Sequence, residues 1–288
     1  MEASALTKII APLVLALMMI GMGLSLVKDD FKRVLLYPKA VGVGTLGQMI
    51  ILPSIAFALV SVLPMQPEIA VGVMVLACCP GGPGSNLVAL LCRGDAALSV
   101  SLTAVSSLLA SFTIPLIVHF ASGHFLNQQA ELEFLKLLDM GVKVCILTLV
   151  PVFIGMFIRN KSPEFAAKSE KPVKFGSVVF LVVLVVSIGF KEKGNLLSLL
   201  EQAGLVGALL CICTMGAGFL IARLAQLNLA QSRSIMIEVG IQNAALALMI
   251  TTVMLNSTAA AIPAAVYSPV MLTISGLLIA YFTFINKK

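Results

Sequence analysis

Charged side chains are scarce in this sequence. Of its 288 residues only 11% are Asp, Glu, Lys or Arg, whereas 59% are hydrophobic and the mean hydropathy is +1.07. One globular core cannot bury that much apolar surface, so the composition excludes a water-soluble domain. Because lipid offers the backbone no hydrogen-bond partner, we expect an all-α, polytopic membrane protein.

Histidine is nearly absent, which argues against the common intramembrane enzymes. The chain has only His119 and His124, and it lacks a His-Glu-x-x-His motif, paired membrane aspartates and Cys/His zinc spacing. Cys78 and Cys79 have no histidine at membrane depth to activate them as nucleophiles. We therefore predict that the protein is not an enzyme and that its six cysteines are buried packing residues.

Hydrophobic runs separated by charged or turn-rich breaks predict about nine transmembrane helices. A membrane core about 30 Å thick needs roughly 20 apolar residues per helix. The candidate spans are 9–27, 38–63, 68–93, 96–120, 134–159, 172–190, 196–225, 231–255 and 262–285. The first run has no small-x-small cleavage site, so we expect a span there rather than a signal peptide. Residues 1–288 are expected to form one transmembrane domain.

The net charge of +6 comes from basic clusters between the hydrophobic runs, not from one basic face, which argues against nucleic acid binding. Most of the 19 Lys and Arg residues fall in every second connection. The positive-inside rule then predicts an outside N-terminus and a cytoplasmic C-terminus, and the compact chain favours a bacterial inner membrane. Lys143 follows Asp139 by four residues, so we interpret it as one half of an i,i+4 pair rather than a substrate ligand.

The third span contains a segment that a continuous helix cannot hold. Residues 80–84 are Pro-Gly-Gly-Pro-Gly, and Ser85 and Asn86 follow at once. Proline lacks an amide donor and glycine disfavours the helix, so we expect a break that leaves backbone groups available to a ligand. A packing kink is the simpler alternative, but a kink needs only one proline.

The eighth span carries Glu238, Gly240, Gln242 and Asn243 near its middle. A carboxylate at that depth must be protonated or face a cation, unless it only forms an interhelix hydrogen bond. The glycine and the amides favour a second break, and oxygen ligands suit Na⁺ better than a transition metal. Two breaks in oppositely oriented spans indicate an inverted-repeat transporter, with repeats at about 9–120 and 134–285.

Together these motifs resemble the bile acid:sodium symporter family. The match in order and spacing runs from about Gly21 to the C-terminus. The residues that carry it are Cys-Cys-Pro-Gly-Gly at 78–82, Ser85-Asn86, Gly94-Asp95, Leu98-Ser99-Val100 and Glu-Val-Gly-Ile-Gln-Asn at 238–243. The resemblance implies a core domain with two crossed broken helices and a panel domain that moves against it.

The resemblance also implies two sodium sites. The residues of the first site would be Ser85, Asn86, Ser99, Thr103 and Glu238. Ser99 and Thr103 are four residues apart, so their hydroxyl groups share a helix face. The second site would use the side chains of Gln48, Glu238 and Gln242 and the backbone carbonyls of Val239 and Ile241. By itself, Gln48 would be interpreted as an interhelix hydrogen bond.

Two departures from the family concern the expected substrate cavity. Pro83-Gly84 stands where many relatives have Thr-Ala, and residues 267–273 lack the Trp-His-Asn pattern of some bacterial relatives. The residues expected to face the substrate are Pro83, Gly84, Asn243, Ser268 and Thr273. These departures leave the identity of the substrate open.

The sequence thus predicts a sodium-coupled symporter that carries an organic anion by alternating access. The anion would be bile-acid-like, a steroid conjugate or a small carboxylate, and a half-helix N-terminus would favour its negative charge. One alternative is a proton-coupled transporter in which Glu238 binds H⁺. Another is a non-transporting receptor or a channel, although a channel normally needs a polar face along several helices. The oligomeric state is left open.

Overall fold

The computed structural model describes residues 5–27, 36–126, 134–169 and 196–284, together with three single positions between 172 and 179. The span predicted over 172–190 lies outside these ranges, so the total of nine spans stays a prediction. Within the described ranges every regular element is helical, which confirms the all-α class, and the one strand-like pairing is an isolated bridge.

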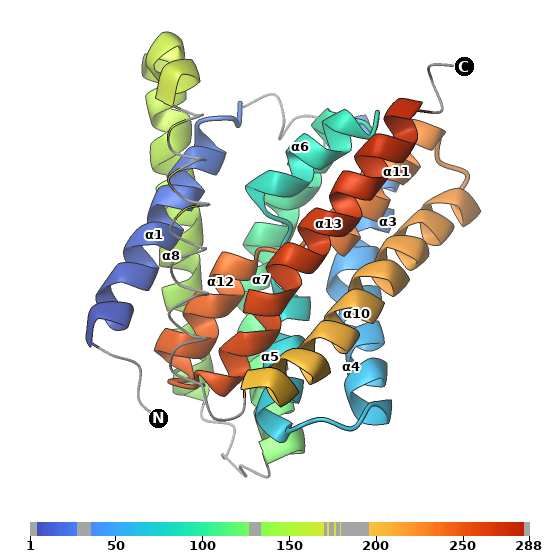
Figure 1. Cartoon of the computed structure of the whole chain (residues 1–288). Helices are drawn as coiled ribbons and strands as arrows, with labels where there is room; N and C mark the ends of the chain where they lie inside the picture. Colours follow the sequence, from blue (N-terminus) through green and yellow to red (C-terminus); the bar gives the residue numbers. More distant parts are fainter. Residues whose placement is uncertain are drawn as a thin grey trace.

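Five described spans are long and apolar enough to cross a membrane. They are Pro38–Val62, Ala96–Leu126, Leu138–Lys161, Glu201–Leu224 and Ala259–Thr283. They correspond to α3 (Pro38–Leu46) with η1 (Gly47–Ile51) and α4 (Leu52–Val62), α7 (Ala96–Leu126), α8 (Phe134–Lys161), α10 (Leu196–Leu224), and η3 (Ala259–Ala261) with α13 (Ile262–Phe284). The α-helices among them are labelled in Figure 1. Helix α1 covers Ala5–Gly23.

Two further spans each consist of two half-helices. One is α5 (Pro67–Cys78) followed by α6 (Pro83–Leu91). The other is α11 (Leu229–Gly240) followed by α12 (Ala244–Met249) and the π-helical η2 (Ile250–Met254). The interruptions fall at the two motifs for which the sequence predicts a broken helix.

The distribution of side chains is that of a protein embedded in lipid. Gln48, Glu238 and Gln242 are each only 1% exposed, whereas Phe112 is 67% and Phe157 is 62% exposed. Exposed apolar surface on this scale marks contact with a membrane. The chain is therefore an integral membrane protein.

Two minor predictions have mixed outcomes. Lys143 Nζ lies 2.5 Å from Asp139 Oδ2, and both side chains are more than half exposed, which confirms the i,i+4 pair. Four cysteines are buried as expected, and Cys145 is half-buried. The prediction is wrong for Cys213, which is exposed on α10 because it lies on the outward-facing side of that helix.

Helices α1 and α8 form a closely packed pair at one side of the molecule (Figure 1). Gly23 and Gly155 lie at their crossing: a Cβ on Gly155 would come within 2.3 Å of the carbonyl oxygen of Ile20. Arg159 adds a hydrogen bond from Nη1 to the carbonyl oxygen of Leu24, 2.7 Å away. Small residues such as Gly23 and Gly155 let membrane helices approach closely.

We expect Gly155→Ala to lower the thermal stability of the purified protein. The new methyl group meets backbone atoms of α1 that cannot rotate away, and such overpacking typically costs about 1–3 kcal/mol. Gly276→Ala on α13 is the matched control, since a Cβ there has no neighbour within 4 Å and alanine favours the helix over glycine. Equal melting temperatures for the two variants would contradict the close crossing.

Candidate functional site

The two broken helices meet at their interruptions. Gly81 and Gln242 form an isolated antiparallel bridge. The backbone N–H of Asn243 donates to the carbonyl oxygen of Pro80 at 2.9 Å. Each unwound segment thus satisfies part of the backbone that the other leaves unpaired, which a membrane interior requires.

Proline and glycine explain why the first helix stops where it does. Pro80 and Pro83 have no amide hydrogen, and Pro83 lies in the first turn of α6, where an N–H would have no partner within the helix. The carbonyl of Cys79, freed by the break, accepts a hydrogen bond from Gln48 Nε2 at 2.8 Å. The carbonyl of Gly82 accepts one from the Ser85 hydroxyl at 2.7 Å.

Glu238, on α11, lies at the centre of a buried cluster of oxygen atoms. The Ser99 hydroxyl lies 2.9 Å from Glu238 Oε2 and 2.9 Å from Asn86 Oδ1. The Thr103 hydroxyl contacts Glu238 Oε1 and lies 3.2 Å from the same Asn86 oxygen. Each hydroxyl carries a single hydrogen, so the acceptor oxygens of this cluster outnumber the hydrogens that can reach them.

No positive side chain offsets the charge of Glu238 within the part of the chain that the structure describes. The salt bridge found there joins Asp139 to Lys143, on the exposed side of α8. Glu238 itself is only 1% exposed. A buried carboxylate without a basic partner needs a cation or a proton, because an isolated ion in a low-dielectric interior is very unfavourable.

A second group of oxygens surrounds Gln48 and Gln242. Gln48 Nε2 donates to Gln242 Oε1 at 2.7 Å, and Gln242 Nε2 donates to the carbonyl of Val239 at 2.8 Å. The Gln48 amide is oriented by the two acceptors that face its nitrogen, Gln242 Oε1 and the Cys79 carbonyl. Gln48 Oε1 is then left buried without a hydrogen-bond partner.

A local change of helix type accompanies Gln48. The segment Gly47–Ile51 is π-helical, with the N–H of Leu52 bonded to the carbonyl of Gly47. Pro53 has no N–H to offer the carbonyl of Met49, so an α-helical ladder cannot continue unbroken through this turn. Such π-helical turns occur often at functional sites.

The structure therefore brings together most of the residues that the sequence singles out. Around Glu238 lie Asn86, Ser99 and Thr103, and Ser85 Oγ faces the same space, since a Cβ on Gly81 would meet both Glu238 Oε1 and Ser85 Oγ. Gln48, Gln242 and the carbonyl of Val239 are joined by hydrogen bonds. Ile241 is buried in the unwound segment beside them.

The residues predicted to face the substrate are more scattered. Gly84 is exposed and has open space around it at the start of α6. Asn243 instead caps α12, its Oδ1 accepting from the N–H of Leu246 at 3.1 Å. Ser268 is buried and donates to Ala264, whereas Thr273 is exposed and donates to Pro269, both within α13. Pro83 is the first residue of α6.

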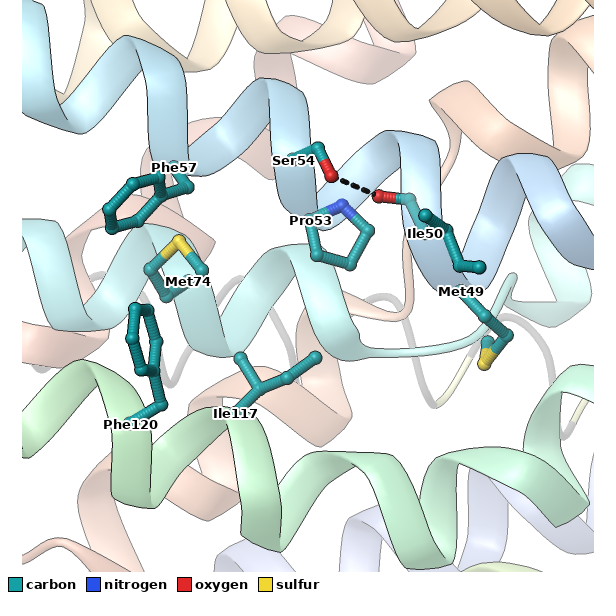
Figure 2. A pocket seen from close by; sticks show the side chains of 8 residues that line it. All are labelled: Met49, Ile50, Pro53, Ser54, Phe57, Met74, Ile117 and Phe120. Atoms are coloured by element: carbon teal, nitrogen blue, oxygen red, sulfur yellow. Dashed lines mark hydrogen bonds between the residues drawn. The ribbon is translucent and has the colours of Figure 1, made fainter.

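The structure also has a cavity of about 360 Å³ (Figure 2). Its walls come from η1, α4, α5 and α7 and are almost entirely apolar; they are formed by Met49, Ile50, Pro53, Ser54, Phe57, Met74, Ile117 and Phe120. The one hydroxyl, that of Ser54, is already bonded to the carbonyl of Ile50 at 2.7 Å. The cavity holds none of the predicted site residues.

Gly81 and Tyr267 are the two residues that sequence reasoning missed at this site. A Cβ on Gly81 would lie 2.1 Å from Glu238 Oε1, so the absent side chain makes room for the carboxylate. The Tyr267 hydroxyl donates to the carbonyl of Gly240 at 2.6 Å. Gly81 lies in a motif that predicts a helix break and resembles the family, but neither reading gives this glycine a role beside Glu238. Tyr267 lies in a different span from the break it contacts.

Comparison with known proteins places the chain in a family. Residues 12–199 match the model of the sodium bile acid symporter family. The chain belongs to this family. It is 33% identical over 278 residues to an uncharacterized sodium-dependent transporter of Bacillus subtilis, YocS, covering 95% of this chain and 82% of that one.

Two other members of the sodium bile acid symporter family show how widely the similarity extends. The human ileal sodium/bile acid cotransporter is 31% identical over 83% of this chain and 68% of its own length. A probable chloroplast sodium/metabolite cotransporter of Arabidopsis thaliana is 34% identical over 88% of this chain and 62% of its own length. These relatives are transporters rather than enzymes, as the sequence predicts, and the family implies the use of sodium.

We expect Gly81→Ala to weaken sodium binding by the symporter by tenfold or more. The added methyl group must displace the Glu238 carboxylate, and tenfold corresponds to about 1.4 kcal/mol. The adjacent Gly82→Ala is the control, because a Cβ there meets no atom closer than 3.6 Å, an ordinary contact. Melting temperature as a function of NaCl gives the midpoint for each variant; equal midpoints for both variants would show that Gly81 does not shape the site.

Proposed function

We propose that this protein is a sodium-coupled symporter of an organic anion that works by alternating access. The observation that carries the proposal is Glu238: a buried carboxylate at the crossing of two broken helices, surrounded by oxygen ligands and without a basic partner among the described residues. Cations that bind there would move down their gradient and so drive uptake of the organic anion.

The first ion would bind among Glu238, Asn86, Ser99, Thr103 and Ser85. All of these offer oxygen atoms, which suit a hard cation. A bound Na⁺ would engage the surplus acceptors that two hydroxyl hydrogens leave unsatisfied. It would also neutralise the carboxylate, which removes the main electrostatic cost of burying this cluster.

The second ion would bind at Gln48, Glu238 and Gln242 with the carbonyls of Val239 and Ile241. Support comes from Gln48 Oε1, which is buried and has no hydrogen-bond partner. An orphaned buried acceptor is rare and costs about 1–3 kcal/mol unless a ligand satisfies it. A cation supplies that partner without needing a hydrogen-bond donor.

An anionic substrate follows from charge balance. Two Na⁺ ions and one carboxylate leave one positive charge, which a monoanion would neutralise. The N-terminus of α6 adds a partial positive charge, and the open space at Gly84 leaves room beside it. The named substrates of the relatives, a bile acid and unspecified metabolites, agree with an organic cargo.

Alternating access would require two bodies that move against each other. The α1–α8 pair at one side of the molecule is the natural candidate for a panel, and the broken helices with α7, α10 and α13 for a core (Figure 1). In this arrangement residues 9–120 and 134–285 would form inverted repeats. The basic clusters would place the chain in a bacterial inner membrane with the N-terminus outside.

A proton-coupled transporter is the second candidate. Its supporting observation is the same buried carboxylate, which a proton neutralises as well as Na⁺ does. Sodium coupling is favoured because a proton on Glu238 leaves Gln48 Oε1 unsatisfied.

We expect NaCl to raise the melting temperature of the purified protein above its value in choline chloride or KCl at equal ionic strength. A ligand at 100 times its dissociation constant stabilises by about 2.7 kcal/mol, and Glu238→Gln should remove most of this gain. Glu201→Gln, at an exposed position of α10, is the control. Equal stability in all three salts would refute sodium coupling, and pH-dependent stability in choline chloride would then favour the proton.

Two buried serines on α7 test the first site separately. Ser99 lies beside Glu238, whereas Ser101 donates to the carbonyl of Ala97 in its own helix at 2.9 Å. We expect Ser99→Ala to raise the NaCl midpoint about tenfold, since it removes an oxygen ligand next to the charge. Ser101→Ala should leave the midpoint unchanged. Equal effects of both substitutions would indicate a general loss of α7 packing instead.

A further inference from the structure

The second break leaves the Gly240 carbonyl without a donor from the two unwound segments. Helix α11 ends at Gly240, whose carbonyl would accept from residue 244 if the helix continued. The N–H of Ala244 is directed elsewhere, to the carbonyl of Gln242 at 3.0 Å. Because lipid supplies no donor, the Gly240 carbonyl needs one from the protein.

Tyr267 of α13 provides that donor. Its hydroxyl lies 2.6 Å from the Gly240 oxygen, and the whole residue is 0% exposed. The ring packs beside Gly207 of α10, where a Cβ would lie 3.6 Å from Tyr267 Cδ2. Cys211, one turn further along α10, places its Sγ 3.6 Å from the same carbonyl and is a much weaker donor.

The hydrogen bond from Tyr267 differs from the others at the two breaks in the helix that supplies the donor. The carbonyl of Cys79 is held by Gln48, that of Pro80 by Asn243, and that of Val239 by Gln242. Those donors belong either to the unwound segments themselves or to residues of the proposed ion sites. Tyr267 alone reaches the broken backbone from α13.

We propose that Tyr267 is a positioning residue for the second sodium site. The peptide between Gly240 and Ile241 is planar, so fixing its oxygen fixes its orientation. Ile241 is extended, with φ −115° and ψ 107°, and in extended backbone successive carbonyls point to opposite sides. Holding the Gly240 carbonyl toward Tyr267 therefore helps to fix the direction of the Ile241 carbonyl, which the proposed second site uses.

The same hydrogen bond joins the ion site to α13. Ser268, the next residue after Tyr267, is among those expected to face the substrate. A displacement of α13 when substrate binds would reach the Gly240 peptide through the tyrosine hydroxyl. Tyr267 then contributes to the coupling between ion and substrate, which is reciprocal by thermodynamic necessity. The inference rests on the proposed sodium-coupled function.

The test is the NaCl dependence of the melting temperature for Tyr267→Phe. Phenylalanine keeps the packed ring and removes only the donor, so we expect the NaCl midpoint to rise about tenfold. Tyr281→Phe, on the same helix at a 58% exposed position, is the control and should retain the wild-type midpoint. A purely structural tyrosine would lower the melting temperature in choline chloride and leave the midpoint unchanged, which would overturn the proposal.

Gly240→Ala provides a second measurement in case Tyr267→Phe does not fold. A Cβ on Gly240 would lie 2.1 Å from Met215 Cγ, so either the Met215 side chain or this peptide must shift, while the donor on Tyr267 is retained. We expect a raised NaCl midpoint here too, and an unchanged one would count against the inference. If wild type responds to NaCl through Glu238 and both variants match it, only the positioning role fails. If wild type does not respond, the proposed function fails and this role with it.

Discussion

The requirement that every backbone group buried in lipid find a partner governs this structure. Continuous helices meet this requirement with their own hydrogen bonds. Where two helices are interrupted, each unwound segment needs partners from the other. Neither unwound segment could exist alone at that depth. The bridge between Gly81 and Gln242 and the hydrogen bond from Asn243 to Pro80 join them, so the site forms only when both broken helices are in place.

Around that crossing the molecule concentrates polar atoms and leaves the outer surface to apolar side chains. Near Glu238 and at the unpaired oxygen of Gln48, hydrogen-bond acceptors outnumber the hydrogens available to them. The chain belongs to the sodium bile acid symporter family, and the family implies the use of sodium. An excess of oxygen acceptors agrees with that, because a cation needs such ligands. Gly81 leaves space for the Glu238 carboxylate, and the Tyr267 hydroxyl donates to the carbonyl of Gly240 at the second break.

Much of this could be predicted from the sequence because it depends on residues that are near one another in the chain. Hydropathy located the ends of the described spans to within about six residues, the largest difference being at the end of α7, and Pro-Gly-Gly-Pro-Gly located the first break. A glutamate in an apolar run indicated a cation site, and the spacing of Ser99 and Thr103 placed both hydroxyls on one helix face. The assignment of Gln48 rested on family resemblance, since an isolated glutamine carries no signal of its own.

What only the tertiary structure decided are the contacts between distant parts of the chain. Gln48 lies 194 residues from the Gln242 amide that it contacts. Tyr267 lies in the span after the break whose carbonyl it holds, and no local pattern distinguishes it from an ordinary core tyrosine. Gly81 is read from the sequence as a helix breaker, and its second role, leaving space for Glu238, appears only when α11 is packed against it. Local propensity and hydropathy determine where helices form and stop, whereas the partners of the freed backbone depend on how the spans pack.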